Sequence, residues 1–262
     1  MYETLQLEVD ARGVARLVLD RADKHNALSA RMIEELHDAA RRLGGDAAVR
    51  AVLLTGSGKS FCAGGDLGWM RAQMAADADT RFAEARKLAM MLNALNTLPK
   101  PLIGAVQGNA FGGGVGLVSV CDVAIGADHL KMGLTETRLG LIPATIGPYV
   151  IARMGEARAR RVFFSGRLFD AAEAVELGLL ARRVPADDLA AAAEAELLPY
   201  LDCAPGAVAA AKRLARALGP RIDEAVIDRT IAALVETWEG DEAPEGIAAF
   251  FDRRKPSWQD RS

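Results

Sequence analysis

Glu136 is the side chain whose surroundings best suit acid–base chemistry. It is flanked by the apolar stretches 132–134 and 139–143. A carboxyl group in apolar surroundings has a raised pKa, and values of about 6–7 suit proton transfer near neutrality. A lone glutamate more often sits on the surface, so this assignment needs support from other parts of the chain.

Two stretches of small residues offer backbone N–H groups to a ligand. Residues 60–67 read Ser-Phe-Cys-Ala-Gly-Gly-Asp-Leu, and Asp66 can cap a helix that begins there. Residues 107–116 contain three consecutive glycines and also precede a predicted helix. Free N–H groups at a helix N-terminus favour an anion. A plain strand-to-helix turn and a tight helix contact are the simpler interpretations, but two such loops can together clamp one oxygen.

Several other sequence patterns look like ligand-binding motifs but do not match them. Residues 58–60 read Gly-Lys-Ser, but a phosphate-binding loop needs Gly at position 53, which is Leu. The glycine cluster at 112–116 is not a dinucleotide fingerprint, because position 117 is Leu. The cysteines and histidines lack ligand spacing; they are Cys62, Cys121, Cys203, His25, His37 and His129. We expect no metal site.

Composition bounds the class of protein. The 262 residues carry 32 basic and 35 acidic side chains, a mixed charge that disfavours a nucleic-acid binder. The sparse, odd cysteine count and the N-terminal sequence, which lacks signal-peptide features, predict a cytoplasmic protein. Residues 101–121 are uncharged, but a proline and six glycines make them a poor membrane span.

Hydrophobic periodicity predicts strand-strand-helix units followed by helices, an α/β chain. Ser29 caps the first helix, and Asp170 with Glu173 forms a capping box before Gly178. Residues 56–65 are predicted to be a loop. The expected strands are 5–9, 14–19, 51–55, 102–106 and 123–125. The expected helices are 30–43, 80–98, 115–121, 187–200, 205–218 and 222–239.

Segments 20–28, 135–143 and 250–258, together with the two glycine stretches, resemble the enoyl-CoA hydratase/isomerase (crotonase) family over most of the chain. The resemblance implies a crotonase-like spiral of ββα units. It also implies a core over residues 1–200 that binds acyl-CoA and performs catalysis. The helical region 201–262 would then mediate trimers, and usually a dimer of trimers.

The resemblance also implies roles for individual residues. The N–H groups of Gly65 and Gly113 form an oxyanion hole, and Glu136 moves protons. The acyl-CoA is the substrate, so no separate cofactor is expected. Residues implied in coenzyme A binding are Lys24, Ala27, Ala63, Asp66, Leu67 and Lys255. The Ala63 carbonyl would contact the adenine, Lys24 would lie near the phosphates, and Lys255 would reach the same coenzyme from a neighbouring subunit. The implied acyl pocket contains Trp69, Met70, Gly116 and Pro143.

The chain departs from the family pattern at Gly116, where many hydratases carry a second glutamate. Glu136 alone can deliver both parts of water, or shift a double bond as a Δ3,Δ2-enoyl-CoA isomerase does. Segments 65–71 and 136–149 resemble hydratases of the methylglutaconyl-CoA type, which favours hydration of a branched or carboxylated substrate. Arg71 or Arg138 would then face a second carboxylate. A non-catalytic CoA- or RNA-binding relative is the third alternative.

Overall fold

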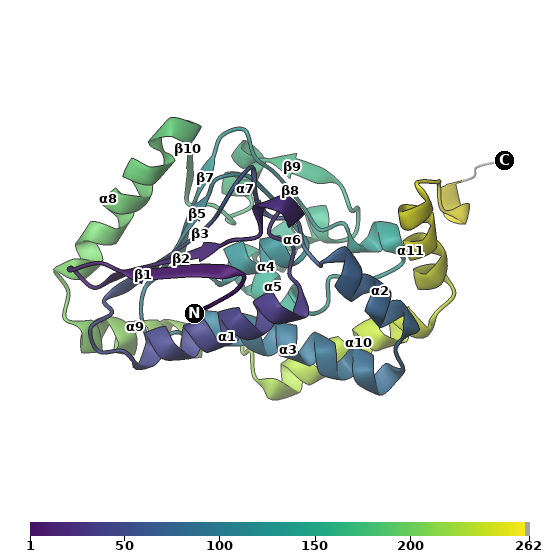
Figure 1. Cartoon of the computed structure of the whole chain (residues 1–262), viewed down its shortest axis with the longest axis horizontal. Helices are drawn as coiled ribbons and strands as arrows, with labels where there is room; N and C mark the ends of the chain where they lie inside the picture. The colour runs from purple at the N-terminus through teal and green to yellow at the C-terminus, as the bar shows by residue number, and fades with distance from the viewer. Residues whose placement is uncertain (260–262) are drawn as a thin grey trace.

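Two β-sheets surrounded by helices make up residues 1–259, the part of the chain that this computed structural model describes (Figure 1). The larger sheet has the order β1-β2-β3-β5-β7-β10, and only β1 and β2 pair antiparallel in it. Its strands are Leu5–Val9, Val14–Leu19, Ala51–Gly56, Leu102–Val106, Val123–Ala127 and Arg182–Val184. The smaller sheet, β4-β6-β8-β9, consists of Ser60–Cys62, Asn109–Phe111, Lys131–Gly133 and Leu168–Asp170.

The chain repeats one pattern three times. Each of β3, β5 and β7 in the larger sheet is followed by a short strand of the smaller sheet, and then by helical structure. Helices α1 to α8 span Ala30–Gly45, Leu67–Ala75, Ala78–Asn96, Gly113–Val120, Gly147–Met154, Glu156–Phe163, Ala171–Glu176 and Leu189–Leu201. Helices α9, α10 and α11 span Pro205–Leu218, Glu224–Glu239 and Glu242–Asp252. The α/β spiral of ββα units with C-terminal helices is therefore confirmed.

Local sequence explains why the first helix packs as predicted. The Ser29 hydroxyl accepts a hydrogen bond from the N–H of Met32 at 3.2 Å and caps α1. The expected apolar face of α1 is buried against the larger sheet, where β3 and β5 are apolar on both faces. A strand covered on both sides reads as a continuous apolar run, which is why these two strands were predictable.

The smaller sheet was not predicted. Its strand β4 lies inside the expected loop 56–65, and β6 lies inside the glycine-rich stretch 107–116. Each of its strands has three residues, too short to show an alternating pattern. Helix α3 begins at Ala78 rather than 80 because Asp77 caps it, and α4 begins at Gly113 rather than 115.

The C-terminal helices return to the body of the protein (Figure 1). Helix α10 packs on α3 through an apolar cluster that includes Ala85, Ala89, Ile227 and Ile231. Helix α11, which was not predicted, contacts the short 3₁₀ helix Glu136–Leu139. Trimer formation by this region and the division at residue 200 remain predictions. Within residues 1–259, no helix combines the length and apolar character that crossing a bilayer requires.

Candidate active site

The smaller sheet brings three chemically interesting segments to one edge. Its strands β4, β6 and β8 are mutually parallel, with Ser60 opposite Asn109 and Ala110 opposite Met132. Parallel strands end at the same edge of a sheet, where α/β proteins place their ligands. The segments that follow these strands are 64–65, 112–113 and 135–136. Three of these six residues, Gly65, Gly113 and Glu136, were predicted site residues, and all six line one cavity.

The two glycine loops lie in contact with each other. A β-carbon on Gly113 would stand 4.0 Å from the Cα of Gly64, and one on Gly112 would stand 3.9 Å from the same atom. The N–H of Leu28 donates to the carbonyl of Gly64 at 2.7 Å and fixes the first loop. The two loops therefore form a single binding surface.

Two backbone N–H groups are free at this surface. Gly65 immediately precedes the cap of α2, and Gly113 is the first residue of α4. Neither N–H donates a hydrogen bond to any residue from 1 to 259. Both lie at helix N-termini, where the backbone dipoles favour negative charge. Each of the two N–H groups is therefore available to a ligand in the cavity that they line.

The Glu136 carboxyl lies beside the second glycine loop. Its Oε1 is 3.0 Å from the place that a β-carbon on Gly112 would take. Its Oε2 is buried and has no hydrogen-bond partner in the described chain. Burial raises the pKa of Glu136 to about 7, although its own backbone N–H acts in the opposite direction. Both protonation states are therefore accessible near neutrality, as an acid–base group requires.

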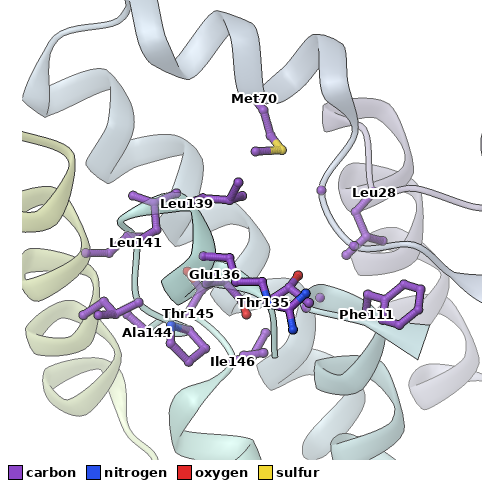
Figure 2. A pocket seen from close by; sticks show the side chains of 18 of the residues that line it. Leu28, Met70, Phe111, Thr135, Glu136, Leu139, Leu141, Ala144, Thr145 and Ile146 are labelled. Atoms are coloured by element: carbon purple, nitrogen blue, oxygen red, sulfur yellow. The ribbon is translucent and has the colours of Figure 1, made fainter. Parts of the chain in front are cut away.

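A cavity of about 550 Å³ opens in front of these groups (Figure 2). Its lining is mostly apolar, with Glu136, Thr135, Thr145 and Arg138 as the polar side chains. The predicted residues that line it are Ala63, Gly65, Leu67, Trp69, Met70, Gly113, Glu136 and Pro143. Such a cavity, with a few converging polar groups, has the character of a small-molecule site.

Asp66 and Ala27, two of the residues predicted to bind coenzyme A, form hydrogen bonds that stabilise the first glycine loop. The Asp66 carboxylate accepts hydrogen bonds from the N–H groups of Gly68 and Trp69, at 2.8 and 3.2 Å, and caps α2. It also pairs with Arg21 at 3.0 Å. Burial alone would raise the pKa of Asp66, but these hydrogen bonds outweigh it and hold the pKa below its usual value. Ala27 is buried, and its carbonyl accepts from Arg21 at 2.7 Å.

The two predicted lysines lie outside the cavity. Lys24 is largely exposed and stands 3.9 Å from Asp23. Lys255 is exposed just after α11. Both lysines are therefore at the protein surface and not in the cavity wall.

Gly116 was expected to line the acyl pocket, but it does not line the cavity. It is buried in α4, and a β-carbon on it would stand 2.6 Å from Cγ2 of Ile146. It is Ile146 that faces the cavity.

Sequence reasoning missed much of the cavity wall. Leu234 and Trp238 come from α10 and Phe250 from α11, about a hundred residues beyond Glu136. Their four-residue spacing places Leu234 and Trp238 on one helix face, which was the available signal. Other lining residues that were not predicted are Leu28, Gly64, Leu88, Phe111, Gly112, Thr135, Leu139, Leu141, Ile142, Ala144, Thr145, Ile146 and Leu168.

The two arginines considered for a second substrate carboxylate are now distinguishable. Arg138 lines the cavity and makes no ion pair with residues 1–259. The guanidinium of Arg71 instead stacks over the ring of Phe251, with 4.4 Å between its central carbon and the ring centroid. Of the two arginines, Arg138 alone contributes to the cavity lining.

Comparison with known proteins gives a consistent result. The family model described as enoyl-CoA hydratase/isomerase matches residues 10–261. A probable enoyl-CoA hydratase of Mycobacterium bovis is 37% identical, with 99% of each chain covered. Crystal structures of enoyl-CoA hydratases from Shewanella pealeana and Mycobacterium avium superpose with TM-scores of 0.81 and 0.85, at 38% and 31% identity. They cover 98% and 99% of this chain, and 97% and 100% of their own.

Proposed function

Since this chain belongs to the enoyl-CoA hydratase/isomerase family, we propose that it is an enoyl-CoA hydratase in which Gly65 and Gly113 form the oxyanion hole and Glu136 transfers protons. The observation that carries this proposal is the convergence of two free backbone N–H groups and one buried carboxyl on a single cavity. The substrate is the thioester of a 2-enoyl group with coenzyme A, and it brings the coenzyme with it.

The oxyanion hole stabilises the charge that develops on the thioester oxygen. When water adds at C3, electrons of the C2–C3 double bond move towards the carbonyl and form an enolate. The N–H groups of Gly65 and Gly113 donate hydrogen bonds to that oxygen. Loss of one such donor typically costs about 2.7–4 kcal/mol of transition-state stabilisation.

Glu136 takes part in two successive proton transfers. As a carboxylate it accepts a proton from water while the water oxygen bonds to C3. As a carboxylic acid it then donates a proton to C2 of the enolate, which yields the 3-hydroxyacyl thioester and restores the carboxylate. A pKa of about 7 leaves both the carboxylate and the carboxylic acid form of Glu136 populated near neutral pH, as the two steps require.

Coenzyme A binding would extend from the cavity over the first loop. In this proposal the Ala63 carbonyl meets the adenine, and Lys24 and Lys255 approach the phosphates. Exposure of both lysines and the position of Ala63 on the cavity wall support this arrangement. Trp69, Met70 and Pro143 would enclose the acyl group, and Leu67 would contact the coenzyme.

A branched or carboxylated acyl group is the finer form of the proposal, with 3-methylglutaconyl-CoA as an example. Arg138 supports it, because this residue contributes to the cavity lining and has no ion-pair partner in the described chain. Comparing turnover of crotonyl-CoA and 3-methylglutaconyl-CoA by wild type and Arg138→Met tests it. A carboxylate preference that Arg138→Met abolishes supports the finer form, and equal loss on both substrates contradicts it.

A homotrimer or homohexamer is also proposed. Helix α9 has no buried residue, and its Leu214 and Leu218 are exposed despite their size. Large exposed apolar side chains on one helix favour a covered interface. Light scattering at several protein concentrations distinguishes a monomer from three or six copies.

The rival activity is Δ3,Δ2-enoyl-CoA isomerisation, favoured by the single cavity carboxylate. The deciding experiment supplies a 2-enoyl-CoA and a 3-enoyl-CoA separately and identifies products by mass spectrometry. The hydratase proposal predicts a 3-hydroxyacyl-CoA from the first, and a large loss of that product with Glu136→Gln. Double-bond migration without hydration supports the isomerase, and binding without turnover supports a non-catalytic relative.

A further inference from the structure

The structure closes the position from which a second carboxylate would act. A β-carbon on Gly116 would stand 2.6 Å from Cγ2 of Ile146, 3.1 Å from its Cβ and 3.4 Å from Cδ1 of Leu92. Ile146 is 3% exposed and its backbone lies at the cap of α5, so it has little room to move. Any side chain at 116 would displace the cavity wall. The attacking water therefore needs a different second partner.

The hydroxyl of Thr145 is a polar group in this wall without an assigned role. Thr145 is buried, lines the cavity and makes no side-chain hydrogen bond with residues 1–259. Its Oγ1 nevertheless keeps some accessible surface, on a residue that lines the cavity. Figure 2 shows Thr145 in the same cavity as Glu136.

Two inward hydroxyl groups elsewhere in the chain are satisfied by the protein itself, whereas the buried Ser57 hydroxyl has no partner within residues 1–259. The Thr55 hydroxyl donates to the carbonyl of Ala105 at 2.8 Å, and the Ser119 hydroxyl donates to the carbonyl of Val115 at 2.8 Å. Buried polar groups are nearly always hydrogen-bonded, to protein or to ordered water. The Thr145 hydroxyl is therefore available to a partner that enters the cavity.

Tight turns on both sides hold Thr145 in place. The N–H of Ala144 donates to the carbonyl of Ile142 at 2.8 Å, and the N–H of Gly147 donates to the carbonyl of Ala144 at 3.1 Å. The carbonyl of Ile146 then accepts from the first turn of α5. A side chain on such a fixed backbone can orient a small molecule without losing much entropy.

We propose that Thr145 positions the attacking water together with Glu136, in place of the second carboxylate; this inference rests on the proposed hydratase function. One O–H of the water donates to the Glu136 carboxylate and the other donates to Oγ1 of Thr145, which leaves a lone pair directed at C3. As the O–C3 bond forms, the first O–H bond breaks and its proton passes to Glu136. The second O–H bond survives as the product hydroxyl.

Hydration and proton exchange at C2 depend on different groups. Exchange at C2 of a saturated acyl-CoA needs the oxyanion hole and Glu136, but no attacking water. A group that positions water therefore matters for hydration and not for exchange. A group that merely supports the site would affect both reactions alike.

The test compares wild type with Thr145→Val, which keeps the shape and removes the hydroxyl, and with Thr145→Ser as the matched control. We expect Thr145→Val to lower kcat for hydration about 10- to 100-fold while KM changes less than about threefold. C2 exchange in D₂O, followed by NMR, should stay within about threefold of wild type. Thr145→Ser should recover most of the hydration rate. Thr145→Ala serves as a second variant with the same expected split if the valine protein does not fold.

Three results would overturn the inference. They are unchanged hydration by Thr145→Val, equal loss of hydration and exchange, and a Thr145→Ser protein as slow as Thr145→Val. Wild-type protein that exchanges C2 protons but hydrates no 2-enoyl-CoA would instead overturn the proposed hydratase function, and the role of Thr145 with it.

Discussion

Oε1 of Glu136 lies 3.0 Å from the point where a β-carbon on Gly112 would stand. The acid–base group and the second glycine loop therefore occupy adjoining space, with the free N–H of Gly113 one residue further along. A hydratase needs this proximity, because the enolate oxygen and the carbon that accepts the proton are only two bonds apart. A side chain at position 112 would therefore disturb both the Glu136 carboxyl and the neighbouring N–H of Gly113.

Gly112→Ala should abolish most of the activity. The new methyl group would press on the Glu136 carboxyl, and Gly112 has φ +47°, where non-glycine residues are strained. We expect kcat/KM to fall at least about 100-fold. Gly155→Ala is the matched control, because Gly155 has φ +75° but nothing within 4 Å of the added carbon. Loss of similar size in both variants would assign the effect to backbone strain alone.

Glu136→Gln should make the protein relatively more stable at alkaline pH. The folded-state pKa of Glu136 is about 7 and its ordinary value is 4.5, so the folded protein favours the neutral acid. Its stability contribution is complete below pH 4.5 and is lost as the pH rises through 7. Relative to the glutamine variant, wild type should lose about 3 kcal/mol of unfolding free energy between pH 5 and 8. Urea unfolding at one protein concentration measures this difference; a constant difference across pH would contradict it.

The hydration rate should depend on the same ionisation. Because the carboxylate must accept a proton from water, kcat/KM should rise with pH and level off above about 7. Glu136→Gln should lower kcat about 10²- to 10⁴-fold and remove this inflection from the residual activity. A pH–rate profile of each protein gives the answer. A wild-type inflection near the ordinary glutamate value of 4.5 would show that burial does not tune this group.

Asp66→Ala should weaken the first loop without touching the reacting groups. It removes the cap of α2 and the ion pair to Arg21, and loss of a cap typically costs about 1–2 kcal/mol. We expect a lower melting temperature and a higher KM for acyl-CoA. Asp66→Asn, which can still cap the helix, should recover most of the stability. If Asp66→Ala and Asp66→Asn have the same lowered melting temperature, the ion pair and not the helix cap stabilises this loop.

The site segments were predictable because each carries its own local signal. The glycine stretches at 60–67 and 107–116 and the glutamate at 136 stand out in sequence, and the structure brings all three to one cavity. What joins them was not predictable from periodicity, because β4, β6 and β8 are three-residue strands paired across long sequence separations. Resemblance to a family supplied the grouping that local pattern could not.

The remainder of the site depends on packing rather than on motifs. Trp238 and Phe250 reach the cavity only because α10 and α11 fold back over α3 and the Glu136 segment. The exclusion of a side chain at Gly116 by Ile146 is likewise a contact between residues thirty positions apart. Such relationships depend on three-dimensional neighbours, which spacing along the chain does not report.

A crystal structure of the Glu136→Gln protein with a bound 2-enoyl-CoA would test the central claim most directly. The two loops predict a thioester oxygen about 2.7–3.1 Å from the backbone nitrogens of both Gly65 and Gly113, with C2 and C3 facing residue 136. Because Glu136→Gln should turn over the substrate slowly, the bound 2-enoyl-CoA should persist long enough to be observed. A thioester oxygen hydrogen-bonded to neither nitrogen, or an acyl chain that leaves the cavity empty, would contradict the assignment.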